Sequence, residues 1–140
     1  MRILGLDLGS RTLGIAMSDS NETIASMKET FRFAEDDYDA AVDRTLEYID
    51  QYKIKTIVLG LPRHMNGDIG VRGEISIEFS EVLKEERPEI EVILSDERLT
   101  TVIAHRALTS MGASIKTKKT RVDQMAAQTI LQSYLDSKKR

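Results

Sequence analysis

An acidic residue inside an apolar segment is the feature that most constrains this chain. Residues 3–8 read Ile-Leu-Gly-Leu-Asp-Leu, so they are apolar except at Gly5 and Asp7. A short, nearly continuous apolar run beside glycine predicts a strand that is buried on both faces. A carboxylate in such a strand costs free energy unless it is paired, hydrogen-bonded or bound to a metal ion. The rest of the chain must therefore supply a partner for Asp7.

Composition limits the class of protein. The length of 140 residues predicts one domain spanning residues 1–140. The sequence has no cysteine, which excludes a disulfide framework and a thiolate metal site. No apolar run reaches the ~20 residues that a membrane span needs, and no signal-peptide pattern is present. We therefore expect a cytoplasmic protein with no membrane partner.

Hydrophobic periodicity predicts three strands followed by alternating helices and strands. Strands are expected at residues 2–8, 13–18, 22–33, 54–61 and 90–94, and helices at 37–52, 71–86, 99–111 and 121–137. The small, polar and basic residues 112–119 predict a connecting loop. The first three strands form an antiparallel meander, and the later β-α-β order predicts two parallel strands with right-handed crossovers. The expected fold is α/β, with a five-stranded mixed sheet and helices on both faces.

Three further acids fall where they can meet Asp7. Asp96 and Glu97 follow the last strand directly, and Asp123 begins the last helix on the same stripe as Ala127. Ligand sites in such sheets lie beyond the carboxyl ends of parallel strands. Clustered carboxylates suit Mg²⁺ or Mn²⁺, and two such ions ~3.5–4 Å apart can drive phosphodiester hydrolysis. The alternative is that each acid pairs with its own arginine or lysine.

Glycines and cations leave other interpretations to weigh. Residues 9–14 contain two glycines, but a second strand follows them instead of a helix, which excludes dinucleotide-binding and P-loop sites. The net charge of −3 gives no overall basic field. A local basic cluster precedes the last helix, however, and fits either salt-dependent phosphate contacts or a solvated loop: Lys116, Lys118, Lys119 and Arg121.

Four sequence blocks resemble those of one family. They are LGLDLG at 4–9 running on to GIA at 14–16, GLP at 60–62 with MNG at 65–67, DERLTT at 96–101, and VD at 122–123 followed by AA and ILQ. The blocks cover nearly the whole chain in the family's order. The chain thus resembles the YqgF (RuvX) family, described both as Holliday junction resolvases and as pre-16S ribosomal RNA nucleases. Thr12 and His64 depart from the family's pattern without touching the acids.

The resemblance implies a ribonuclease H-like fold and a divalent-metal site. In that family's pattern, Asp7, Glu97 and Asp123 would hold Mg²⁺ or Mn²⁺, as two ions, with Asp96 beside Glu97 as a further catalytic candidate. These four positions are all carboxylates in this sequence. The resemblance therefore implies an intact catalytic site.

Nucleic-acid contacts are expected around these acids. Arg11, at the turn after Asp7, and Arg98, after the acids, can each clamp a phosphate or neutralise a neighbouring carboxylate. Asn66 lies in the loop 62–70, which follows a parallel strand and either contacts nucleic acid or merely connects two elements.

The expected function is a metal-dependent nuclease, an endonuclease acting on structured nucleic acid. Precursor 16S ribosomal RNA is the favoured substrate, with association with the ribosome, as a monomer or a homodimer. A Holliday junction resolvase and a non-catalytic nucleic-acid-binding module remain alternatives. The phosphate loop of sugar kinases is disfavoured, because those enzymes close ATP between two domains and 140 residues hold one.

Overall fold

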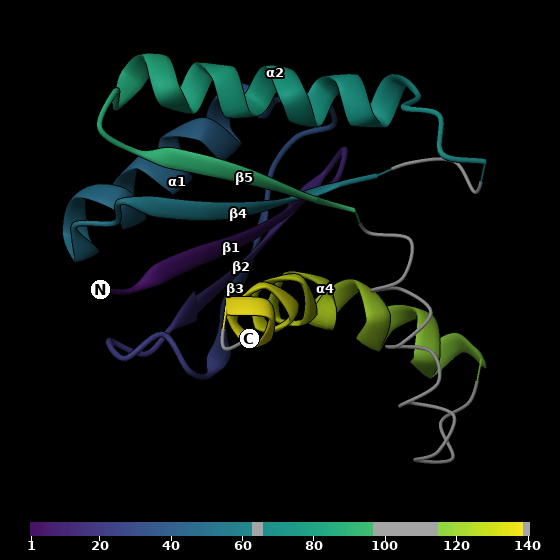
Figure 1. Cartoon of the computed structure of the whole chain (residues 1–140). Coiled ribbons are helices and arrows are strands. Elements are labelled where there is room, and N and C mark those ends of the chain that lie inside the picture. Colours follow the sequence, from purple (N-terminus) through teal and green to yellow (C-terminus); the bar gives the residue numbers. More distant parts are fainter. Residues whose placement is uncertain (63–65, 97–114, 139–140) are drawn as a thin grey trace.

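The protein contains a mixed β-sheet with helices on both faces (Figure 1). The computed structural model describes residues 1–62, 66–96 and 115–138, of which 115–124 are described by their backbone alone. The strands are β1 (Ile3–Leu8), β2 (Thr12–Ser18), β3 (Ala25–Arg32), β4 (Thr56–Leu61) and β5 (Glu91–Asp96). The helices are α1 (Tyr38–Tyr52), α2 (Val71–Glu86) and α4 (Ile115–Lys138).

The strand order confirms the predicted sheet. The order is β3-β2-β1-β4-β5, with β1–β2 and β2–β3 antiparallel and β1–β4 and β4–β5 parallel. The parallel strands β1, β4 and β5 therefore end at the same side of the sheet, which we call the carboxyl edge. This is the edge at which ligand sites form in open α/β sheets.

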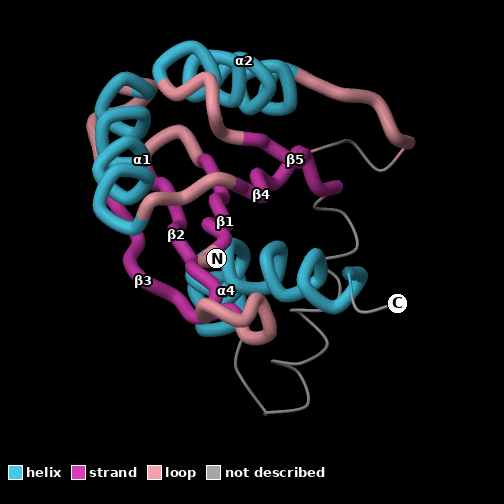
Figure 2. Tube along the Cα trace, turned by 60° about the vertical axis from the view of Figure 1, so that its left-hand side comes forward, coloured by secondary structure: helices cyan, strands magenta, loops and turns pink. Residues whose placement is uncertain are grey.

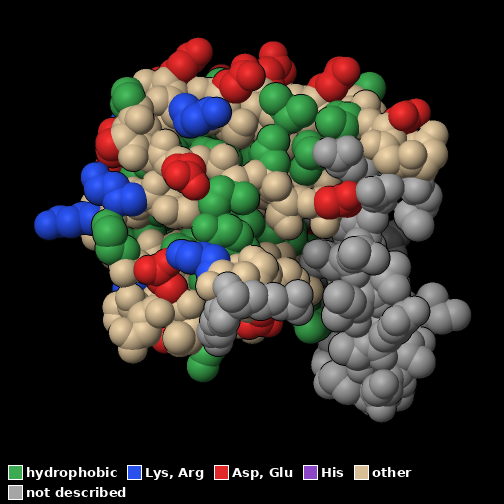
Figure 3. All heavy atoms as spheres, viewed as in Figure 1, with side chains coloured by type: hydrophobic (Ala, Val, Ile, Leu, Met, Phe, Trp, Pro, Cys, Tyr) green, Lys and Arg blue, Asp and Glu red, His purple; other side chains and the backbone are tan. Residues whose placement is uncertain are grey.

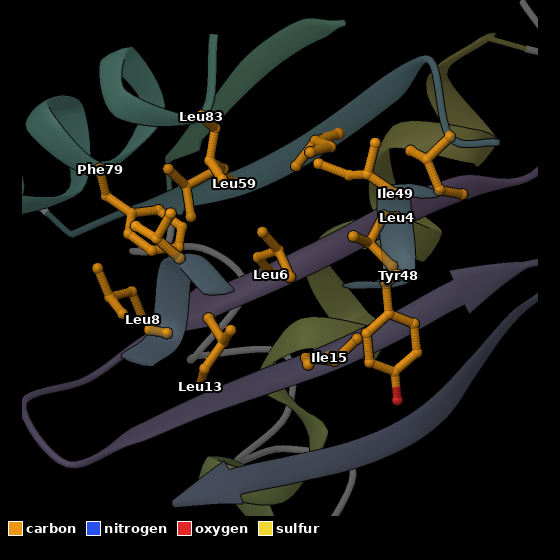
Figure 4. Close-up of a cluster of buried hydrophobic side chains, with 14 of the residues drawn as sticks. Leu4, Leu6, Leu8, Leu13, Ile15, Tyr48, Ile49, Leu59, Phe79 and Leu83 are labelled. Atoms are coloured by element: carbon orange, nitrogen blue, oxygen red, sulfur yellow. The ribbon is translucent and has the colours of Figure 1, made fainter. Parts of the chain in front are cut away.

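Helices α1 and α2 cover one face of the sheet, the α1–α2 face, and α4 covers the other, the α4 face (Figures 1 and 2). On the α1–α2 face, the side chains of Leu4 and Leu6 pack against Ile49 of α1 and Leu83 of α2 (Figure 4). The α4 face holds a smaller cluster: Ile3, Ala16, Ala25, Val58, Ala127, Ile130, Leu131 and Leu135. Because strand residues alternate between faces, these clusters give the face of each strand residue.

Strand β3 changes its alternation part-way along. Ile15 pairs with Glu29, but the next residue, Ala16, pairs with Met27, so Lys28 is an extra residue in β3. This bulge reverses which residues of β3 lie on which face. Met27 packs in the α4-face cluster before the bulge, and Phe31 packs in the α1–α2 cluster after it.

Acidic side chains dominate the outer surface of α2, along the top of Figure 3, where Glu74, Glu78, Glu81 and Glu85 are exposed. Such a surface repels the phosphate backbone of a nucleic acid. No helix among the residues described is long and apolar enough to cross a membrane.

The structure corrects the predicted start of the last helix. Residues 115–119 were expected in a loop and the helix from 121, but α4 begins at Ile115. No glycine or proline follows Gly112 before the helix, and lysine has good helix propensity, so nothing in 115–120 stops the helix from extending. The helix predicted at 99–111 and the rest of that loop, 112–114, lie outside the described residues.

Candidate metal centre

Asp7 lies on the α4 face near the carboxyl end of β1. Asp7 is directly opposite Gly14 of β2, and a Cβ built at Gly14 would lie 3.6 Å from Asp7 Cβ and 3.4 Å from Ala127 Cβ of α4. The β1–β4 register pairs Leu6 with Leu59, so the next position beside Asp7 on β4 is Gly60. Glycines therefore flank Asp7 on both neighbouring strands, and no side chain from either position crowds its carboxylate.

The Asp7 carboxylate is half-buried, and no residue in the described part of the chain hydrogen-bonds or ion-pairs with it. Several other acids do have partners. Glu29 accepts a hydrogen bond from Tyr48 Oη at 2.9 Å, and the Asp50 carboxylate accepts two hydrogen bonds from Arg87, at 2.8 and 2.7 Å. A half-buried carboxylate without such partners is the group that a bound cation would stabilise.

Helix α4 packs closely enough to the sheet to bring a second acid near Asp7. A Cβ at Gly5 would lie 2.7 Å from Leu131 Cβ and 3.0 Å from the Ala127 carbonyl oxygen, so the helix packs directly on this glycine. Leu131 lies over Gly5 and Ala127 lies near Asp7, so α4 runs antiparallel to β1. Position 123 is one turn before Ala127, about 6 Å farther toward the carboxyl edge.

Asp96 and Asp7 lie on opposite faces of the sheet. Asp96, the last residue of β5, pairs with Leu61. Val92 of the same strand packs in the cluster on the α1–α2 face, and period-two alternation places Asp96 on that face with it. Ser95 therefore lies on the α4 face with Asp7. Glu97, the next residue after Asp96, is outside the described part of the chain.

The remaining candidates have varied surroundings. Arg11 donates from Nη2 to Glu35 Oε2 at 3.2 Å, an exposed pair. Asn66 forms a turn with Asp68, accepting from its backbone N–H at 3.0 Å, and Gly67 between them has φ 97°. Lys116, Lys118, Lys119, Arg121 and Asp123 lie in the first turns of α4, with only their backbone described, and Arg98 lies outside the described residues.

The sequence analysis did not identify Arg72, a cation near the carboxyl edge. Arg72, in the first turn of α2, donates from Nη1 to Tyr38 Oη at 2.8 Å and from Nη2 to the Leu8 carbonyl at 3.3 Å. Arg72 thus ties α1 and α2 to the residue that follows Asp7. No sequence signal could have found it, because its partners are a hydroxyl 34 residues away and a backbone carbonyl.

The donor chemistry at this edge fits a hard divalent cation. Within the described residues no group of three or more histidines, aspartates and glutamates converges to hold a metal ion. Asp7 is among the described residues, whereas Glu97 and the side chain of Asp123 are not. Asp7 supplies carboxylate oxygens, the ligand type that Mg²⁺ and Mn²⁺ prefer.

Solved structures with the same architecture define the class of fold. RuvC of T. thermophilus, in complex with a Holliday junction substrate, matches with a TM-score of 0.65 at 12% identity, over 99% of this chain and 95% of that one. The Holliday junction resolvase of fowlpox virus matches with a TM-score of 0.57 at 16% identity, over 98% and 99%. The fold is therefore ribonuclease H-like, as the family resemblance implied.

Sequence comparison defines the family. The model of the RuvX family, described as Holliday junction resolvase, matches residues 1–137, and the chain belongs to this family. Proteins of Staphylococcus aureus, strains bovine RF122 and JH9 among them, are each 44% identical over 136 residues, which is 97% of this chain and 96% of theirs. They carry the provisional name pre-16S rRNA nuclease.

Proposed function

We propose that this protein is a divalent-metal-dependent endonuclease that hydrolyses phosphodiester bonds in precursor 16S ribosomal RNA. The observation that carries the proposal is the Asp7 carboxylate, which has no partner among the described residues and is flanked by glycines at the carboxyl edge. Family membership and the provisional name of the Staphylococcus aureus relatives support the reaction and the substrate. The proposal places the protein in the cytoplasm, acting on ribosome precursors.

Asp7, Glu97 and Asp123 are the proposed ligands of Mg²⁺ or Mn²⁺. Helix α4 supports a role for Asp123, because its antiparallel course over β1 carries position 123 toward the carboxyl edge. Asp96 lies on the opposite face from Asp7, which argues against Asp96 as a ligand, and the family resemblance assigns that role to Glu97. The proposal therefore gives Asp96 no role as a ligand.

The residues of the chain have separate tasks in the proposed reaction. Bound as a pair, the ions would supply an activated water and a Lewis acid for the leaving oxygen. The backbone of Asp7 is held in place, since its strand is paired on both sides, with β2 and with β4. Arg11, Arg98, Asn66 and the basic start of α4 would contact phosphates around the scissile bond.

A cleavage assay tests the proposal. Precursor 16S ribosomal RNA and a DNA four-way junction are offered side by side, with Mg²⁺, with Mn²⁺ and with a chelator. We expect the RNA to be cut only with a divalent ion, Asp7→Asn to abolish cutting, and the control Asp96→Asn to retain it. Calorimetry with Mn²⁺ alone should show weaker binding to Asp7→Asn than to Asp96→Asn.

Two outcomes would change the assignment. A folded Asp7→Asn variant that cuts as fast as the parent would rule out this metal site. Cleavage of the DNA junction in place of the RNA would favour the resolvase function, which the fold shared with T. thermophilus RuvC makes the second candidate. Binding without cleavage in any divalent ion would indicate a non-catalytic module.

A further inference from the structure

Arg32 of β3 is an exposed arginine on the same face of the sheet as Asp7. The register runs from Asp7 to Gly14 on β2 and from Gly14 to Thr30 on β3, while Arg32 lies opposite Thr12. Because Gly14 faces α4, its cross-strand neighbour Thr30 also lies on the α4 face, and so does Arg32 two residues later. Thr30 is two strands from Asp7, about 10 Å away.

The bulge in β3 is what places Arg32 on this face. If β3 alternated regularly through Lys28, Arg32 would lie on the α1–α2 face, the face opposite to that of Met27 and Asp7. With the bulge, Glu29 lies toward α1, where its carboxylate meets Arg44. The same backbone irregularity thus places the half-buried Glu29 against α1 and leaves Thr30 and Arg32 exposed beside the site.

Arg32 has no partner within the described part of the molecule. The other arginines described there each donate at least one hydrogen bond: Arg2, Arg11, Arg44, Arg72 and Arg87. The guanidinium of Arg32 makes no hydrogen bond, ion pair or ring contact with any described residue. Its guanidinium is thus available to an anionic ligand on the face that carries Asp7.

The backbone around Arg32 is fixed. Arg32 pairs with Thr12 at the end of β2, and the next residue, Phe33, donates its N–H to the Arg11 carbonyl at 2.9 Å. The strand is therefore hydrogen-bonded through Arg32 and past it, so that only its side chain must be ordered when a ligand binds.

We propose that Thr30 and Arg32 bind the sugar-phosphate backbone of the RNA on the β3 side of Asp7. The guanidinium of Arg32 forms a charge-assisted contact with a phosphate, and the Thr30 hydroxyl donates to a neighbouring oxygen. The RNA strand would then run along the carboxyl edge of the sheet from β5 to β3, past Asp7. The inference rests on the proposed function, since it assumes that a nucleic acid lies at the Asp7 site.

The test measures binding separately from cleavage. A fluorescein-labelled hairpin from precursor 16S ribosomal RNA is titrated with Asp7→Asn protein that carries a second substitution. Arg32→Ala should weaken binding about 5- to 20-fold and lower the slope of log K against log salt by about one. Arg32→Lys should restore part of the affinity. The matched control is Lys28→Ala, an exposed cation of the same strand near the Tyr52 ring on the α1–α2 face, and it should bind like the parent.

Binding and cleavage together separate this inference from the proposed function. If the otherwise unaltered protein cuts RNA but Arg32→Ala binds and cuts like Lys28→Ala, the proposed Arg32–phosphate contact is wrong, while the proposed nuclease function is supported. If binding depends on Arg32 and no divalent ion supports cleavage, the proposed Arg32–phosphate contact is supported and the proposed nuclease activity is contradicted. An Arg32-dependent preference for a DNA four-way junction would support the contact and overturn the RNA substrate.

Discussion

Asp7 and Gly14 face each other across β1 and β2, and Ala127 of α4 packs beside both. A Cβ at Gly14 would lie 3.6 Å from Asp7 Cβ, an ordinary van der Waals contact. Packing would therefore allow an alanine at position 14. What the glycine provides is the absence of a side chain beside the Asp7 carboxylate, with Ala127 Cβ 3.4 Å from the position that a Cβ would take.

Substituting Gly14 separates packing from function. We expect Gly14→Ala to fold with a free energy of unfolding within ~1 kcal/mol of the parent, because the methyl meets its neighbours at normal distances. Cleavage should fall about 10- to 100-fold, because the methyl displaces groups bound at Asp7. Urea unfolding and the RNA cleavage rate measure the two effects. A variant that is unstable, or fully active, would show that Gly14 has a different role.

Gly5 is the glycine to compare with Gly14, because an alanine at Gly5 is expected to destabilise the fold. A Cβ there would lie 2.7 Å from Leu131 Cβ and 3.0 Å from the Ala127 carbonyl oxygen, so α4 must shift to admit it. Gly5→Ala should cost about 1–3 kcal/mol of unfolding free energy, the usual penalty for overpacking. Unfolding in urea provides the measurement. An equal stability of Gly5→Ala and Gly14→Ala would mean that α4 packs less closely than the structure shows.

Sequence periodicity predicted the strands, their parallel and antiparallel pairing and the helices on both faces, because each rests on local alternation of apolar residues. The bulge at Lys28 could not be read, since one extra residue in a polar strand leaves no periodic signal. The face of the sheet on which Asp96 lies could not be predicted from the sequence either. The strand was expected to end at residue 94, and only its pairing with β4 through Leu61 carries it on to Asp96.

The candidate site shows the same limit. Asp7 was identified because a carboxylate in an apolar strand is costly, a local property. Arg32 and Arg72 were not identified, because their importance depends on cross-strand register and on contacts distant in sequence. Local chemistry can be inferred from a sequence. The face of the sheet on which a side chain lies can be assigned only when the pairing register of the strands is known.

Arg72 and Tyr38 should be energetically coupled. Arg72 Nη1 donates to Tyr38 Oη at 2.8 Å, and Tyr38 Oη donates to Asp36 Oδ1 at 3.0 Å. In a double-mutant cycle with Arg72→Ala and Tyr38→Phe, we expect a coupling energy of about 0.5–1.5 kcal/mol in urea unfolding. Arg72→Ala should also slow cleavage more than Tyr38→Phe, because Arg72 alone of the two holds the Leu8 carbonyl beside Asp7. Additive effects would contradict the contact.

Gln132 of α4 hydrogen-bonds to the start of the edge strand β3 and to a residue just before it. Its Oε1 accepts from the Ala25 N–H at 2.8 Å and its Nε2 donates to the Thr23 carbonyl at 3.1 Å. Gln132→Ala should lower the free energy of unfolding by about 1–2 kcal/mol, the net value of two hydrogen bonds, and speed hydrogen exchange at Ala25. Gln51→Ala, at an exposed glutamine of α1, is the control. Unchanged exchange at Ala25 would show that water satisfies this amide equally well.

Asp19 should make folding sensitive to acid. Hydrogen bonds from the Thr23 hydroxyl, at 2.5 Å, and from the Thr23 and Ile24 backbone N–H groups lower the pKa of Asp19 to about 2. The unfolded chain titrates near the ordinary value of about 3.9, so the ionised carboxylate stabilises the native state above that pH. This stabilisation is lost as the pH falls from about 4 toward 2.

Unfolding in urea at several pH values measures this loss. Asp19→Asn should be less stable than the parent at pH 7 and should show a shallower decline below pH 4, because the titrating group is gone. Thr23→Val removes the hydroxyl donor but keeps the carboxylate, so its decline should be smaller than the parent's and should level off at a higher pH. If both variants follow the parent's pH profile, the hydrogen bonds to Asp19 do not persist in solution, and other carboxylates set the acid limit.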